Sequence, residues 1–79
     1  MNIPEIEERT LPLFPMEVWS SPVLFRNALY YHVSHTLTKK AAESEAKTLK
    51  REGHTVELFR KRGVIPLWGI YSTDPTLEV

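Results

Sequence analysis

Three histidines, together with scattered hydroxyl and acidic side chains, are the residues of this 79-residue chain that could do chemistry. His32 and His35 are three residues apart, and His54 is remote from both. On one regular strand the first two would point to opposite faces of a sheet, which is the wrong arrangement for a shared metal ion. Zinc-type sites also draw on cysteine or carboxylate partners. We therefore predict no metal site and no cofactor.

Nucleophilic catalysis needs a nucleophile, a base and an orienting group around a pocket. Ser34 precedes His35, but neighbouring residues on a strand do not bring their side chains together. Gly53, Gly63 and Gly69 form no phosphate-binding loop. The carboxylates are spread along the chain and suggest no acid–base pair. We predict a protein that is not an enzyme and has no small-molecule substrate.

The composition excludes further classes of protein. There is no cysteine, which excludes disulfides and thiolate metal sites. A domain of this size buries only about 60% of the surface of its unfolded chain, so a partner chain is the support we expect first. The N-terminal MNIPEIEERT is acidic and does not resemble a secretory signal, and no apolar run is long enough to span a membrane. We expect a soluble cytoplasmic protein without membrane contact.

The zero net charge conceals an uneven distribution. Residues 39–63 carry eight cationic side chains against four glutamates, whereas the segments on either side are each net acidic. Such a block can balance the acidic ends of the same chain, or it can attract an anionic partner.

Four of the six prolines fall within residues 1–27, a segment that is nevertheless rich in large apolar side chains. Proline restricts φ and favours extended neighbours, so we predict an extended arm lying on an apolar surface. Ser21 and Pro22 have the types expected at the cap and first position of a short helical turn.

The rest of the chain predicts a small α+β domain over residues 28–73, followed by a tail at 74–79. ALYYHVS (28–34) and HTVELFR (54–60) alternate as strands do, and a third strand begins near Leu67 after Pro66. Between the first two lies a helix capped by Thr38, ended by Gly53 and lined by an alanine stripe. The result is a βαββ unit with one helix packed on a three-stranded sheet, and the basic residues 60–62 near a hairpin tip.

The stretch YYHVSHTLTKKAAESEAKTLKREGHTVELFRKRGVIPLWGIYS (30–72) resembles the first half of a SPOR-type repeat. The shared pattern is a tyrosine-rich strand, a helix like AAESEAKTLKREG, the strand HTVEL, and a hairpin into an aromatic strand. The resemblance implies a fold similar to ribonucleoprotein domains and binding to peptidoglycan glycan strands. The second helix and fourth strand of that family have no counterpart here, and no glycan-binding residue is assigned.

One helix covers one face of a sheet, so we expect the other, aromatic face to be uncovered and to bind a partner. The leading hypothesis is a non-catalytic interaction module that self-associates or binds another protein through Trp68, Tyr71, Tyr30, Phe14 and Trp19. The alternative is nucleic-acid binding by the basic helix face and the hairpin tip, through Lys40, Lys47, Lys50, Arg51, Arg60, Lys61 and Arg62.

Overall fold

The computed structural model describes residues 2–63 and 65–79. It contains one α-helix and two short 3₁₀ helices among six strands, in the order β1 Glu5–Ile6, η1 Glu8–Thr10, β2 Leu13–Phe14, β3 Val23–Phe25, β4 Ala28–Thr36, α1 Lys39–Arg51, β5 Val56–Lys61, β6 Trp68–Ser72 and η2 Pro75–Leu77. Within these residues no helix is long and apolar enough to cross a membrane.

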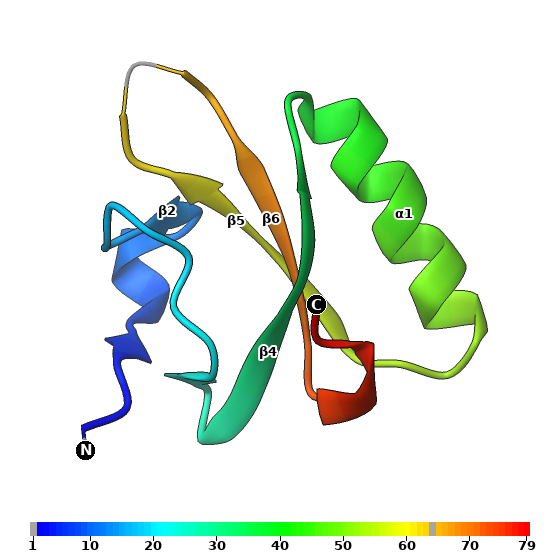
Figure 1. Ribbon diagram of the computed structural model, residues 1–79, viewed down its shortest axis with the longest axis horizontal. Helices are drawn as coiled ribbons and strands as arrows, with labels where there is room; N and C mark the ends of the chain where they lie inside the picture. Colours follow the sequence, from blue (N-terminus) through cyan, green and yellow to red (C-terminus); the bar gives the residue numbers. More distant parts are fainter. Residues whose placement is uncertain (1, 64) are drawn as a thin grey trace.

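The strands form one mixed sheet in the order β1-β3-β4-β6-β5-β2. Strand β6 pairs antiparallel with both β4 and β5, which therefore run parallel to each other and are joined by α1. The α+β class and the β4-α1-β5-β6 order agree with the sequence prediction. The predicted number of three strands is wrong, because β1, β2 and β3 extend the sheet at both ends (Figure 1).

The additional strands come from the proline-rich segment. Each of its strands has only two or three residues and begins directly after a proline, namely Pro4, Pro12 or Pro22, whose missing N–H limits strand length. The proline carbonyls still accept: Leu24 N donates to Pro4 O at 2.8 Å, and Arg60 N donates to Pro12 O at 2.6 Å. The predicted helical turn at Ser21–Pro22 is also wrong, because this segment leads directly into strand β3.

Strands β3 and β4 form a hairpin whose turn residues are Arg26 and Asn27, with φ of 51° and 61°. Two successive positive φ values are typical of the tight turn that matches the twist of antiparallel strands. Asparagine tolerates this conformation better than most residues.

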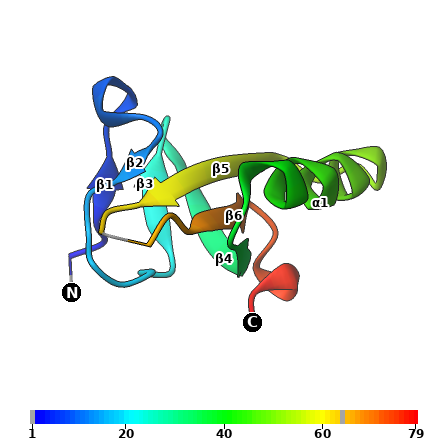
Figure 2. The same ribbon diagram turned by 90° about the horizontal axis from the view of Figure 1, so that it is seen from above.

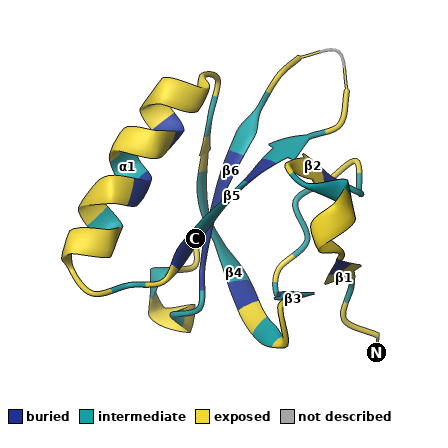
Figure 3. Cartoon of the chain, turned by 180° about the vertical axis from the view of Figure 1, so that it is seen from behind, coloured by how far each residue is buried: buried dark blue, intermediate teal, exposed yellow. Residues whose placement is uncertain are grey.

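Helix α1 begins and ends as its sequence predicts. The Thr38 hydroxyl accepts a hydrogen bond from Ala41 N at 3.1 Å, and Gly53 adopts a φ of +93° after the last turn. Only Ala42 and Ala46 of the helix are buried and Glu45 and Leu49 are half-buried, and Figure 3 shows this narrow covered stripe along a helix that is otherwise exposed.

The sheet has a core on each face. The arm-side core contains seven buried residues, drawn from all six strands: Ile6, Phe14, Val23, Phe25, Tyr30, Phe59 and Tyr71. The helix-side core contains Ala42, Ala46, Val56 and Ile70. Figure 2 shows α1 at one end of the molecule and β1, β2 and β3 at the other. The six strands thus curl around the larger core, and α1 covers the smaller one.

Candidate interaction surface

The aromatic face that we expected to be uncovered is enclosed within the single chain. Phe14 and Tyr71 are fully buried, and Tyr30 is 5% exposed. The Phe14 ring lies 5.7 Å from the Tyr71 ring and 6.3 Å from the Phe59 ring, measured between centroids. The arm therefore folds back onto its own sheet, and these three predicted contact residues cannot touch a partner unless the core opens.

Tyr71 is held in place by its polar end as well as by its ring. Its hydroxyl donates a hydrogen bond of 2.6 Å to the carbonyl of Ser20 in the arm. Burial raises the pKa of this phenol far above its usual range, and the Glu78 carboxylate adds to the effect. Tyr71 thus remains a neutral donor that ties the arm to β6.

Trp19, a further predicted contact residue, is half-buried and its ring lies against Gly69 of strand β6. A Cβ atom added at Gly69 would come within 2.8 Å of the Trp19 ring, so only glycine fits beneath the indole. The Phe14 ring lies 4.9 Å from it on one side, and His32 and His35 lie at 5.6 and 6.3 Å. Trp19 closes the rim of the arm-side core.

The two histidines share one face of the sheet, contrary to the sequence prediction. A register shift in the β4–β6 pairing between His32 and Ser34 adds one residue to β4 and reverses the alternation. His35 Nδ1 lies 3.4 Å from His32 Nε2. Burial lowers the pKa of His32, and the charge on His35 lowers it further.

This pair lacks the further ligands of a metal centre. Within residues 2–63 and 65–79, no group of three or more histidine or acidic side chains is placed to hold a metal ion. The ring nitrogens instead contact each other, which leaves the pair as part of the packing around Trp19.

The helix side of the sheet presents a different surface. Trp68, the last predicted contact residue, is half-buried at the start of β6 and packs against the helix-side core. The Lys39 ammonium lies 5.5 Å from the centre of its ring, within the range of a cation–π interaction. Arg60 is its cross-strand partner on β5. Trp68 is therefore a large side chain with an exposed part between two cations.

Next to Trp68 runs a groove between the helix and the neighbouring strand, which we call the α1–β5 groove. It is lined by Glu43, Ala46, Lys47, Lys50 and Leu58. Its volume of about 290 Å³ is at the lower limit of the roughly 300–1,000 Å³ typical of small-molecule sites. The groove is better suited to side chains of a macromolecular partner than to an enclosed cofactor.

The two flanks of α1 differ in charge. On the β4 side, the Glu45 carboxylate accepts a hydrogen bond of 2.6 Å from Ser34. The opposite flank, over β6 and β5, carries three lysines and a single glutamate: Lys39, Lys47, Lys50 and Glu43. Among the described residues, the ion pairs include Lys39–Glu43 at 3.8 Å but none to Lys47, Lys50 or Arg60. The α1–β5 groove therefore combines two apolar residues, Ala46 and Leu58, with a flank of α1 that is net positive.

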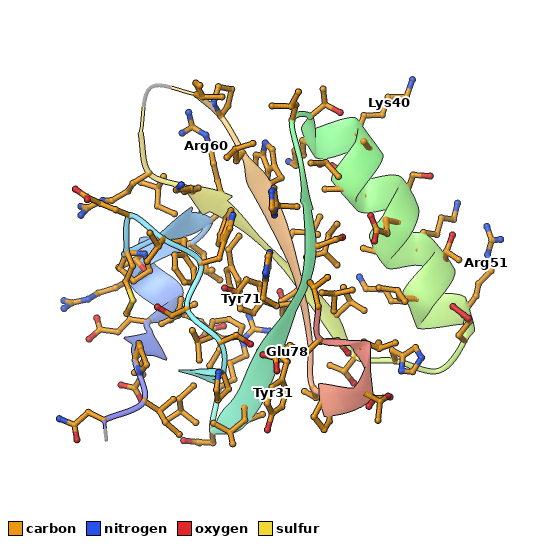
Figure 4. The ribbon with its side chains drawn as sticks, viewed as in Figure 1. Tyr31, Lys40, Arg51, Arg60, Tyr71 and Glu78 are labelled. Atoms are coloured by element: carbon orange, nitrogen blue, oxygen red, sulfur yellow. The ribbon has the colours of Figure 1, made fainter. Side chains whose placement is uncertain are left out.

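The seven cations predicted for nucleic acid do not form one patch. Figure 4 shows Lys40 and Arg51 at opposite ends of α1, both pointing away from the sheet, whereas Arg60 extends from β5. Lys61 and Arg62 continue from β5 into the loop that leads to β6. Only Lys47 and Lys50 line the groove.

Sequence reasoning missed Lys39, Glu43 and Leu58 as members of a surface. The spacing of positions 39, 43, 46 and 50 does mark one side of a helix. It does not indicate which strand lies beside that side.

Comparisons of the chain with protein-family models, with curated proteins and with solved structures found no match. The resemblance to SPOR repeats therefore remains a prediction.

Proposed function

We propose that this chain is a non-catalytic interaction module that binds an acidic segment of a partner protein along the α1–β5 groove and Trp68. The observation that carries the proposal is the pairing of exposed apolar area with unpaired cations. Leu58 and Trp68 are half-buried beside Lys47, Lys50 and Arg60, for which the described residues provide no ion pair. Tryptophan and arginine are the residue types most favoured as interface anchors.

Charge argues against a second copy of the same chain as the occupant. A symmetric contact would place the lysine-rich flank of one α1 against that of its copy, which like charges disfavour. The aromatic face on which self-association was expected is enclosed by the arm. We therefore expect a monomer in sedimentation equilibrium across the micromolar range; a dimer would favour self-association instead.

The test is a titration of the isotopically labelled protein with an acidic peptide, followed by amide chemical shifts. The probe is an acetylated peptide of alternating glutamate and valine, about eight residues long. We expect shifts at Leu58, Lys47, Lys50 and Trp68, and an affinity that weakens with salt. The same peptide with lysine in place of glutamate is the control. Equal binding of both peptides, or shifts only on the arm side, would contradict the proposal.

Nucleic-acid binding is the second candidate. It is favoured by Lys40 and Arg51, which point away from the sheet, together with Lys47 at the edge of the groove. The described residues provide no ion pair to any of the three. It predicts a gel shift with single- or double-stranded oligonucleotides at low salt, and a steep loss of affinity as salt rises. No shift at tens of micromolar protein would remove this candidate.

A further inference from the structure

From the pairing of β5 we infer that the partner's acidic segment binds as an added strand, through the main chain of Leu58. The inference rests on the proposed function and specifies how the partner is held.

Alternate residues of β5 direct their N–H and C=O groups to opposite edges. Lys61 N donates to Leu67 O at 2.7 Å, and Thr73 N donates to Thr55 O at 3.3 Å. Positions 55 and 61, and the odd-numbered residues between them, therefore face β6 in this antiparallel pair. Val56, Leu58 and Arg60 face the other edge.

That other edge is only partly covered. Strand β2 pairs with β5 at Arg60 and Lys61, where Arg60 N donates to Pro12 O. Within residues 2–63 and 65–79, no strand pairs with this edge at Leu58. Val56 is buried, whereas Leu58 is half-buried and its side chain lines the α1–β5 groove. Leu58 is thus the position where an unpaired strand edge and the groove coincide.

An extended segment continuing the line of β2 would meet both features together. Its main chain would exchange hydrogen bonds with the N–H and C=O of Leu58, as in the recognition of peptides by strand addition. Alternate side chains of a strand point to the same face, so every second residue would lie against α1. Lys47 and Lys50 on that flank favour glutamate or aspartate at those positions.

Short, covered edges are the usual way in which sheets avoid pairing with other chains. Here β2 provides such a cover over the last two residues of β5, and its pairing begins at Arg60 and does not include Leu58. The β5 edge is therefore covered at Arg60 and Lys61 and uncovered at Leu58, beside the lysine-rich flank of α1.

The test separates main-chain from side-chain recognition at Leu58. Leu58→Pro removes the outward N–H and spares the bonds to β6, since proline is tolerated at an edge position of this kind. Leu58→Ala removes most of the side chain and retains the N–H, so it is the matched control. With the glutamate–valine peptide we expect the proline variant to bind about tenfold more weakly than the alanine variant, as for the loss of one hydrogen bond. Equal affinities would overturn strand addition.

Amide hydrogen exchange in the unmodified protein gives a second measurement that needs no substitution. We expect the Leu58 amide to exchange faster than those of Glu57 and Phe59 in the free protein, and at least about tenfold more slowly with saturating peptide. Peptide binding that leaves Leu58 exchange unchanged would overturn strand addition and leave the proposed function standing. No binding at millimolar peptide would overturn both.

Discussion

The two faces of the sheet are covered in different ways, and this difference is the basis for the interaction surface that we propose. The arm-side core is built from large aromatic rings and is sealed by a segment that folds back around the sheet. The helix-side core is covered by a helix whose buried residues are two alanines. Small side chains let the helix approach closely but shield little area, so Leu58 and Trp68 keep exposed parts. The face with more aromatic residues is the one that is closed.

The unequal covering of the two faces affects stability as well as binding. Large rings packed by the arm make the greater contribution from apolar burial, which scales with the area removed from water. The arm is therefore part of the folded domain rather than an attachment to it. Substitutions on its side should destabilise the protein more than substitutions on the helix side.

Phe14→Ala is expected to have the largest effect. It removes a fully buried ring that contacts Trp19 and Tyr71, and such truncations cost about 3–5 kcal/mol. That is comparable with the whole stability of a small domain, so the variant should be largely unfolded by circular dichroism and urea titration. Leu13→Ala, at the exposed neighbouring position, should stay folded. A folded, stable Phe14→Ala protein would show that the arm is not needed to close the core.

Gly69→Ala should come next, with a loss of about 1–3 kcal/mol from overpacking. The new methyl group would press against the Trp19 ring at 2.8 Å. The free energy of unfolding from urea titration measures the effect. The same substitution made in a Trp19→Ala background should cost clearly less, because the opposing ring is gone. An equal cost in both backgrounds would mean that the contact is not the cause.

Thr38→Ala tests the helix side and should cost about 1 kcal/mol. It removes the hydroxyl that accepts from Ala41 N at the start of α1. Thr38→Ser retains that acceptor and is the matched control. The loss should be smaller than that from Phe14→Ala in the same urea titration. A loss of equal size would mean that the two faces contribute alike.

The pH dependence of stability should identify His32 as part of the arm-side packing. Burial lowers its pKa in the folded protein, so the unfolded chain takes up the proton more readily. The stability that depends on neutral His32 is fully present above the ordinary histidine pKa of about 6.5 and is lost as the pH falls through the folded value.

Thermal unfolding measured from about pH 8 down to about pH 5 should therefore show a steeper decline for the natural chain than for His32→Gln. His35→Gln should reduce the decline only in part, because the charge on His35 is the second cause of the lowered pKa, after burial. Identical pH profiles for the natural chain and His32→Gln would contradict this role.

Helix α1 and strands β4, β5 and β6 could be predicted from the sequence because caps and side-chain alternation depend only on neighbouring residues. Thr38 and Gly53 mark the ends of α1 through capping and a positive φ, and the alternation in HTVELFR separates Leu58 from Phe59 correctly. The failures involve residues far apart in the chain. Pairing of Leu13 with Arg60, or of Glu5 with Leu24, leaves no periodic pattern in strands of two or three residues. The bulge that puts His32 and His35 on one face is equally invisible to regular alternation.

The sequence is sufficient to predict an α+β domain with one amphipathic helix, since periodicity, caps and turn residues act over a few neighbouring positions. It also determined that the apolar area of the sheet exceeds what an alanine-lined helix can cover. The segment that covers the excess is evident only in the three-dimensional packing, because Phe14 and Trp19 reach Tyr71 through the curl of the whole sheet. This packing also brings Leu58 of β5 beside Lys47 and Lys50 of α1, where we propose that the partner binds.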